Sequence, residues 1–246
     1  MREIGLILAA SIRNNLRFTV TNLVVLSVIL ICVIGLAVTF CLVLIGPAMQ
    51  SASPDRSTLA SDLSLIMCVT CLLGLGIYLN GSAFQTMTRE KSRGNIETLL
   101  AAPLKPREIW IAKSLAVFLP GLVLGEVLTL LVLIAVNYLY FVPRIGFVAN
   151  SWLLISNFIA VPLVYLGLSL IVFLVGLTGK PANGNVIVQV FPPCLAALVI
   201  NLAVRSVLDA GSWTFTLICC GLAAVMGIII LLLYPRLAKE RIILSR

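Results

Sequence analysis

The fold is decided by one polar stretch, TREKSRGNIETLLAAPLKPREIWIAK at residues 88–113, which interrupts an otherwise apolar chain. The stretch carries nine of the 26 charged side chains, six of them basic and three acidic. Because charged groups are costly in hydrocarbon, residues 89–93 at its start belong outside a bilayer. The stretch therefore separates the apolar runs before it from those after it.

Within this stretch the residue types predict two helices with a break between them. Gly94 breaks the chain, and Asn95 is a good N-cap for a short helix that begins near Ile96. Pro103 restricts the residue before it and ends that helix after about two turns. Pro106 suits the first position of a second helix, which runs into the next apolar segment. We expect a short surface helix between two membrane spans.

The composition as a whole is that of a polytopic membrane protein. Of the 246 residues, 61% are hydrophobic and 11% are charged, which is far from the balance of a soluble domain. The net charge of +8 would indicate nucleic-acid binding in a soluble chain. Here the basic residues lie between apolar runs, so membrane topology explains them and no nucleic-acid partner is expected.

Six apolar runs are each long enough to cross the hydrocarbon as a helix, which takes about 20 residues. The sequence therefore predicts an all-α protein whose residues 1–246 form a single transmembrane domain. The expected spans lie near residues 22–46, 62–86, 110–139, 151–178, 186–204 and 213–234, with a cytoplasmic segment at 88–109 between the second and third.

The lysines and arginines predict the orientation of these spans. With the N-terminus inside, 14 of the 17 basic residues face the cytoplasm, and only Arg56, Arg144 and Arg205 lie outside. This asymmetry favours a multi-pass protein of the cell membrane with both termini cytoplasmic. Tryptophans prefer the headgroup layer, and Trp110, Trp152 and Trp213 each fall at a predicted span end.

Residues 1–21, before the first span, show apolar residues at helical spacing. The recurring residues are Ile4, Ile7 or Leu8, Ile12 and Leu16, with Arg13 and Arg17 between them. One interpretation is an amphipathic helix that lies on the inner leaflet. The other is an ordinary start of the first span, with arginines that reach back to the headgroups.

The central polar stretch resembles the cytoplasmic segment of ABC-2 type transporter permeases. In that family a cluster of charges is followed by Gly, then Glu three residues on, two leucines, and Pro-Leu. The matching residues here are Glu90, Lys91, Gly94, Glu97, Leu99, Leu100, Pro103 and Leu104, with Lys113 before the next span. The motif covers about a tenth of the chain, while the layout of spans is similar across most of it.

The resemblance implies the membrane subunit of an ABC exporter. Two such permease subunits, as a homodimer or heterodimer, would pair with two ABC ATPase subunits that bind ATP-Mg. The short helix would couple them through Arg93, Gly94, Asn95, Ile96, Glu97, Leu99, Leu100, Pro103 and Leu104. One feature departs from the family: many members have a sizeable outer segment between the fifth and sixth spans, where this chain has only residues 205–212.

Glu126 is the one ionisable residue placed deep in a predicted span, about 20 Å along the helix from Lys113. It either lines a transport pathway or dimer interface, or is a neutral carboxyl that bonds helices together. Gly121 and Gly125 form a G-x-x-x-G that lets another helix approach closely. The other polar residues expected inside spans, with the same two interpretations, are Asn157, Gln189 and Asn201.

The motifs of several enzyme classes are missing from the sequence. There is no G-x-x-x-x-G-K-[ST] nucleotide-binding loop, and without histidine there is neither an H-E-x-x-H metal site nor a Ser-His triad. We therefore expect no enzyme activity, cofactor or metal in this chain itself. Two other functions stay open: a secondary carrier or channel that works without an ATPase, and a membrane anchor or assembly factor that transports nothing.

Overall fold

The computed structural model describes residues 2–15, 20–50, 55–92, 105–179, 181–205 and 207–237. All elements in these residues are helical, as the sequence predicts. In chain order they are α1 Arg2–Asn15, α2 Val20–Phe40, η1 Cys41–Ile45, α3 Gly46–Gln50, α4 Arg56–Ser92, α6 Pro106–Val136, η2 Asn137–Phe141, α7 Ser151–Ile155, η3 Ser156–Ala160, α8 Val161–Thr178, α9 Pro181–Val204, α10 Trp213–Leu233 and η4 Tyr234–Arg236.

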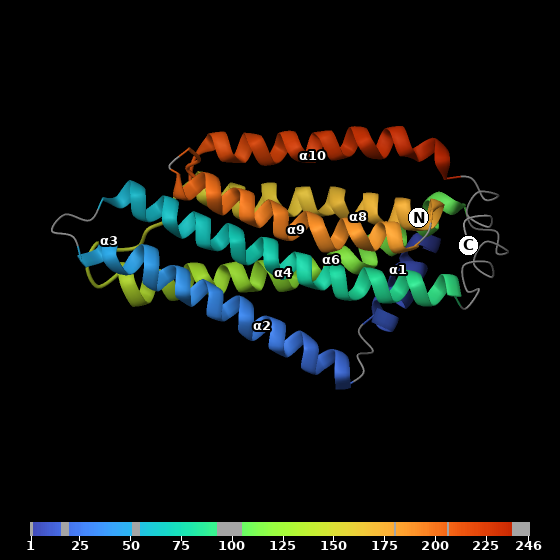
Figure 1. Cartoon of the computed structure of the whole chain (residues 1–246), viewed down its shortest axis with the longest axis horizontal. Coiled ribbons are helices and arrows are strands. Elements are labelled where there is room, and N and C mark those ends of the chain that lie inside the picture. The colour runs from blue at the N-terminus through green and yellow to red at the C-terminus, as the bar shows by residue number, and fades with distance from the viewer. Residues whose placement is uncertain are drawn as a thin grey trace.

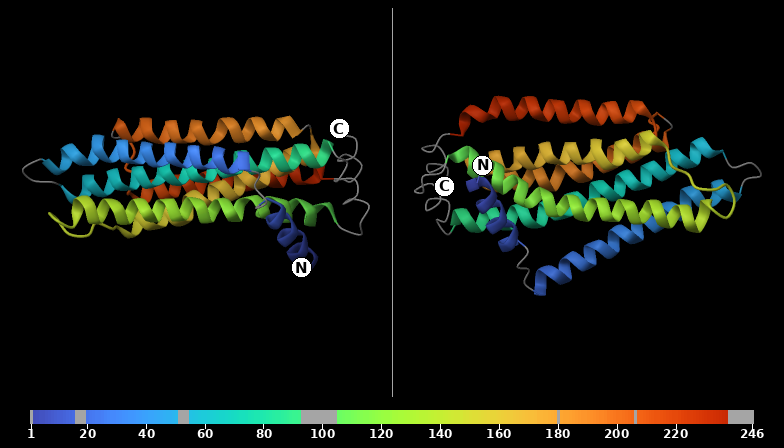
Figure 2. Two further views of the ribbon diagram at one scale, coloured as in Figure 1. Left: turned by 90° about the horizontal axis from the view of Figure 1, so that it is seen from below. Right: turned by 180° about the vertical axis from the view of Figure 1, so that it is seen from behind.

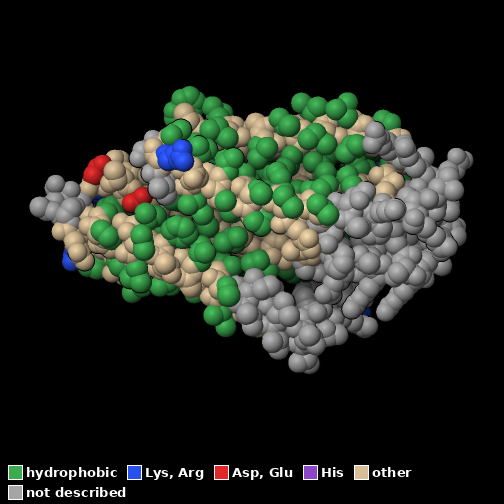
Figure 3. Space-filling view, in the orientation of Figure 1, with side chains coloured by type: hydrophobic (Ala, Val, Ile, Leu, Met, Phe, Trp, Pro, Cys, Tyr) green, Lys and Arg blue, Asp and Glu red, His purple; other side chains and the backbone are tan. Residues whose placement is uncertain are grey.

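Six helical stretches of the described residues are long and apolar enough to cross a membrane, which confirms the predicted number. They are Leu30–Gln50, Arg56–Asn80, Pro106–Phe141, Ser151–Thr178, Val186–Ala203 and Trp213–Leu233. Three of them contain a π-helical turn, η1, η2 or η3, between or after α-helical segments. Figure 3 shows that hydrophobic side chains cover most of the described part of the visible face along the helices.

The helices form one elongated bundle with α4 in its interior (Figure 1). Within an apolar window of 18 residues in each stretch, 83% of the residues are buried in α4, against 33% in the α6–η2 stretch and 22% in the α2–η1–α3 stretch. α4 packs against α6, α8 and α9, and α10 packs on α8 from outside. Because α4 contacts most of the other spans, it is the helix around which the bundle is built.

The two ends of the bundle differ in what they contain. One end, which we call the α1 end, holds α1, the start of α6 and η4; the other, the η2 end, holds α3, the start of α4 and η2 (Figures 1 and 2). α1 packs against α6 and crosses the direction of the long helices. A helix at residues 2–15 is therefore present, and its contact with a membrane surface stays a prediction.

α2 joins the bundle by only one of its ends. Its second half and the segment after it pack on α4 and α6 at the η2 end, through Ala37, Cys41, Ile45 and Met49. Toward Val20 the helix leaves the bundle at an angle and stands apart from α4 (Figure 1 and the right view of Figure 2). The first span is thus peripheral, while the second is central.

Candidate functional site

The predicted coupling residues, from Arg93 to Leu104, lie outside the described residues, so their arrangement stays a prediction. Their two flanks are described. α4 continues to Ser92, twelve residues past the apolar stretch that ends at Asn80. α6 begins at Pro106, as the sequence predicts, and the backbone N–H of Lys105 donates to Glu108 Oε2 over 3.2 Å. The motif therefore connects the ends of α4 and α6.

The start of α6 is anchored inside the bundle. Trp110 is buried, and its indole N–H donates to the Leu170 carbonyl of α8 over 2.9 Å. Its ring lies 6.3 Å from that of Tyr234, over which the Arg107 guanidinium is placed at 6.0 Å. The structure packs Trp110 against α8 and η4 near the start of the span, and its position in the headgroup layer stays a prediction. Inside the bundle, the polar ring nitrogen finds a carbonyl as its partner.

Four residues were predicted to line a pathway or a dimer interface, and the structure does not bring all four together. Gln189 and Asn201 are exposed on α9, while Asn157 is fully buried in η3. Glu126 is partly exposed as a residue, but both of its carboxyl oxygens are buried. Only Glu126 and Asn157 are therefore inside the bundle.

Asn157 belongs to a hydrogen-bond network that joins three segments. Its side-chain amide donates to Ser64 Oγ of α4 at 3.1 Å and to the Leu153 carbonyl at 2.9 Å. The Ser64 hydroxyl in turn donates to the Ala210 carbonyl before α10, at 2.7 Å. The side-chain oxygen of Asn157 is buried and has no hydrogen-bond partner in the described ranges. Asn157 therefore mainly connects η3 to α4 by hydrogen bonds.

Glu126 lies where α4 and α6 cross. Within the described part of the chain, the carboxyl oxygens have no hydrogen-bond partner, and Cys71 of α4 lies near them. Cys71 also borders Thr129 of α6, and its thiol donates to the Asn157 carbonyl over 3.9 Å. Cys71 thus lies near both Glu126 and Asn157. We call Ser64, Cys71, Glu126, Thr129 and Asn157 the α4 polar cluster.

The predicted G-x-x-x-G brings α6 against α4 of the same chain. A Cβ atom added at Gly125 would lie 2.9 Å from Leu75 Cγ, and one at Gly121 would lie 3.2 Å from a Tyr78 ring carbon. From the other side, a Cβ at Gly74 would lie 3.3 Å from the Gly125 Cα. These glycines let the two backbones approach, and they place Glu126 at the crossing.

At the η2 end, two arginines and an asparagine that the sequence does not predict as functional residues make contacts that position the loop at residues 142–150. Arg144 donates to the Met49 carbonyl of α3, and Arg56 donates to the Ile145 carbonyl. Asn137 accepts from the Val148 N–H at 2.6 Å and donates to the Leu133 carbonyl. One feature of the sequence could have indicated these contacts: Arg56 and Arg144 are two of the three basic residues that the predicted topology places outside.

Among the described residues, no group of three or more Cys, Asp or Glu side chains is arranged to hold a metal ion. No family model, curated protein or solved structure matches the chain. The candidate sites are therefore the predicted coupling segment, defined by its sequence and its two flanking helices, and the α4 polar cluster.

Proposed function

We propose that the chain is the membrane-spanning subunit of an ATP-driven exporter of the ABC-2 type, and that a separate subunit binds and hydrolyses ATP-Mg. The observation that carries the proposal is where the motif lies: it connects α4, the central helix, to α6, the helix that crosses α4 at Gly125. In a protein that only needed a connection between two spans, a shorter polar turn would be sufficient.

The flanking helices would carry a displacement from the motif into the bundle. The twelve residues of α4 beyond Asn80 extend it by about 18 Å at 1.5 Å per residue. On the other side, α6 is tied to α8 by the Trp110 indole and by the Ser169 hydroxyl, which donates to the Ser114 carbonyl over 3.0 Å. Because these contacts are packed and hydrogen-bonded, a movement of residues 93–104 would shift α4, α6 and α8 together.

In this proposal the α1 end faces the cytoplasm. α1 and η4 both lie at this end, and most of the lysines and arginines belong to it in the predicted topology. Two copies of this permease, or this chain with a related one, would form the transport pathway between them, each bound to one ATPase subunit.

The test is co-purification of the chain with an ATPase subunit encoded beside it. We expect the ATPase subunit to be retained by the wild type and lost with Glu97→Arg, which reverses a charge in the motif, or with Gly94→Pro. Arg205→Gln is the matched control. It removes a charge from an exposed residue in the predicted outer segment 205–212, on the opposite side of the membrane from the motif. If both motif variants retain the ATPase and its ATP-dependent transport, the coupling function is wrong.

One observation favours a second function, a carrier coupled to protons without any ATPase. Glu126 presents a buried carboxyl with no hydrogen-bond partner among the residues that the structure describes, and ionisable groups in membrane spans often relay protons. Glu126→Gln keeps the shape and removes the ionisation. For a proton-coupled carrier we expect transport by the purified chain in vesicles to lose its response to a pH gradient. In an ATP-driven exporter, this variant should assemble normally with altered transport, and the transport that remains should still require ATP.

A further inference from the structure

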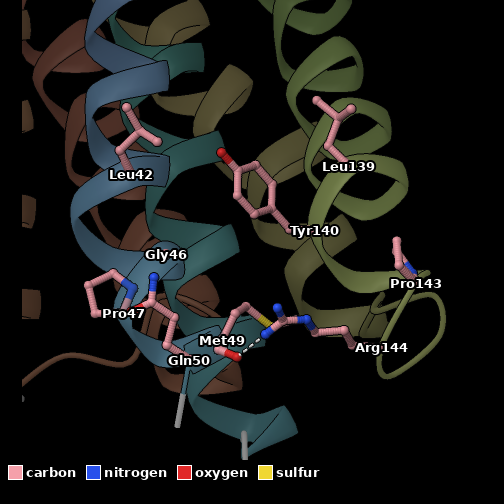
Figure 4. A pocket seen from close by; sticks show the side chains of 9 residues that line it. All are labelled: Leu42, Gly46, Pro47, Met49, Gln50, Leu139, Tyr140, Pro143 and Arg144. Carbon is pink, nitrogen blue, oxygen red and sulfur yellow. Dashed lines mark hydrogen bonds between the residues drawn. The ribbon is translucent and has the colours of Figure 1, made fainter.

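A cavity of ≈ 540 Å³ opens between the α2–η1–α3 segment and η2 at the η2 end (Figure 4). Its volume is within the roughly 300–1,000 Å³ typical of small-molecule sites. One wall comes from Leu42, Gly46 and Pro47, and the other from Leu139, Tyr140 and Pro143. Each wall includes residues of a π-helical turn, η1 or η2, and such turns are frequent at functional sites.

The polarity of the cavity changes along the bundle axis. Leu42 and Leu139 face each other across the side nearer the middle of the bundle, and both are largely exposed. Gln50 and Arg144 lie at the opposite side, toward the tip of the η2 end. From Leu42 to Gln50 the chain rises by about 12 Å at 1.5 Å per residue. The cavity is thus apolar toward the middle of the bundle and cationic toward the tip of the η2 end.

Arg144 supplies the positive charge of this cavity. Among the described residues its side chain makes one hydrogen bond, to the Met49 carbonyl, although a guanidinium has five N–H donors. None of the described residues that line the cavity is acidic. The charge of Arg144 is therefore not neutralised by the cavity, and its remaining donors match the planar, bidentate geometry of a phosphate.

We propose that this cavity binds the phosphate headgroup and the upper acyl chain of an anionic phospholipid from the leaflet that meets the η2 end. Arg144 and the Gln50 amide would hold the phosphate, and Leu42 and Leu139 would contact the chain. A free anion would use only the cationic side, and an uncharged lipid only the apolar side. The two sides together, in the order that a bilayer imposes, fit an amphiphile. The proposal requires that the chain spans a membrane, and it is independent of an ATPase partner.

The test measures phosphatidylglycerol retained by the purified full-length chain in detergent, by native mass spectrometry over a range of lipid concentrations. We expect Arg144→Gln to weaken the retention by about tenfold or more, since a hydrogen bond between charged groups is lost. Gly46→Leu should weaken it similarly, because Gly46 lines the cavity and a larger side chain there would take up part of its volume. Only Cys41 O lies within 4 Å of a Cβ added at Gly46, at 3.9 Å, so the Cβ itself meets no clash.

Two variants are matched controls for these changes. Arg205→Gln removes an exposed arginine of the same predicted side, and Gly35→Leu adds the same side chain to α2 at a position with nothing within 4 Å. Both should retain the lipid within about twofold of the wild type. If Arg144→Gln does not fold, Gly46→Leu still decides, because the Met49 contact remains in that variant.

Three results would overturn the proposal. Retention that is unchanged in Gly46→Leu would place the lipid elsewhere on the chain. Competition by inorganic phosphate or glycerophosphoglycerol, at the concentrations where phosphatidylglycerol binds, would show a site for the anion alone. Equal retention of a diacylglycerol with the same chains would show an apolar groove without recognition of the headgroup.

Discussion

α2 and α4 each belong to a stretch that is apolar enough to cross a membrane, but their surroundings are very different. α4 is enclosed by α6, α8 and α9, whereas α2 contacts the bundle at the η2 end and stands apart toward Val20. Their glycines show the same contrast. A Cβ atom added at Gly74 of α4 would lie 3.3 Å from the Gly125 Cα. A Cβ atom added at Gly35 of α2 would have nothing within 4 Å. Close approach, rather than hydropathy, therefore distinguishes the central helix from the peripheral one.

The largest effect should come from closing the gap between α4 and α6. We expect Gly125→Leu to lower the free energy of unfolding by about 3 kcal/mol, the upper end of the range for overpacked cores, because the new side chain meets Leu75 and the Cys71 carbonyl. The measurement is the thermal unfolding midpoint of the chain in detergent, followed by size-exclusion chromatography.

Gly35→Leu is the comparison for this change, and it should alter the stability by no more than about 0.5 kcal/mol. Equal destabilisation by both variants would mean that α2 is packed as closely as α4. A stable Gly125→Leu variant would mean that α6 crosses α4 elsewhere.

A smaller effect should separate the two polar residues Asn157 and Gln189. Asn157→Ala removes hydrogen bonds to Ser64 and Leu153 and should cost about 1 kcal/mol, as expected for bonds between membrane helices. Gln189→Ala changes an exposed side chain of α9 and should be close to neutral. Urea or detergent denaturation of the two variants provides the comparison, and a larger loss in Gln189→Ala would contradict the network.

The sequence predicts much of the architecture, but it does not predict that α4 is central and α2 peripheral. Six apolar helices and the start of α6 at Pro106 follow from run length and residue type. The difference between α2 and α4 does not, because lipid and a protein interior both favour apolar side chains, so neither helix shows a polar face.

In the candidate sites, too, the sequence predicts some features and only the packing shows the others. Gly121 and Gly125 were correctly expected to permit close approach, but the motif does not specify which helix approaches, and the structure identifies α4. Asn157, Gln189 and Asn201 had equal standing as polar residues in apolar runs, and only packing separates the buried one from the other two. The arginine contacts at the η2 end join residues far apart in the chain, which no local pattern reveals.

The smallest effect concerns the start of α4. Asp55 precedes this helix, and hydrogen bonds from the side chain and backbone of Ser57 lower the pKa of its carboxyl. A lowered pKa in the folded state stabilises the protein above the unfolded pKa of about 3.9, and this contribution is lost as the pH falls through the folded pKa. Asp55→Asn should thus be slightly less stable than the wild type at pH 7.

The pH dependence of this difference is the check. The unfolding midpoints of Asp55→Asn and the wild type should converge as the pH is lowered below about 4. Ser57→Ala removes a donor to the same carboxylate and should show the same convergence. A difference that grows toward low pH would contradict the assigned sign.

We propose that a separate ATPase subunit docks on the segment between α4 and α6. The most direct measurement places a photo-cross-linking amino acid at Leu99 in this segment, or at Leu139 at the η2 end, in cells that also express the ATPase subunit. We predict a cross-link to the ATPase from Leu99 and none from Leu139. A cross-link from Leu139 alone, or no ATPase cross-link from Leu99, would contradict the claim.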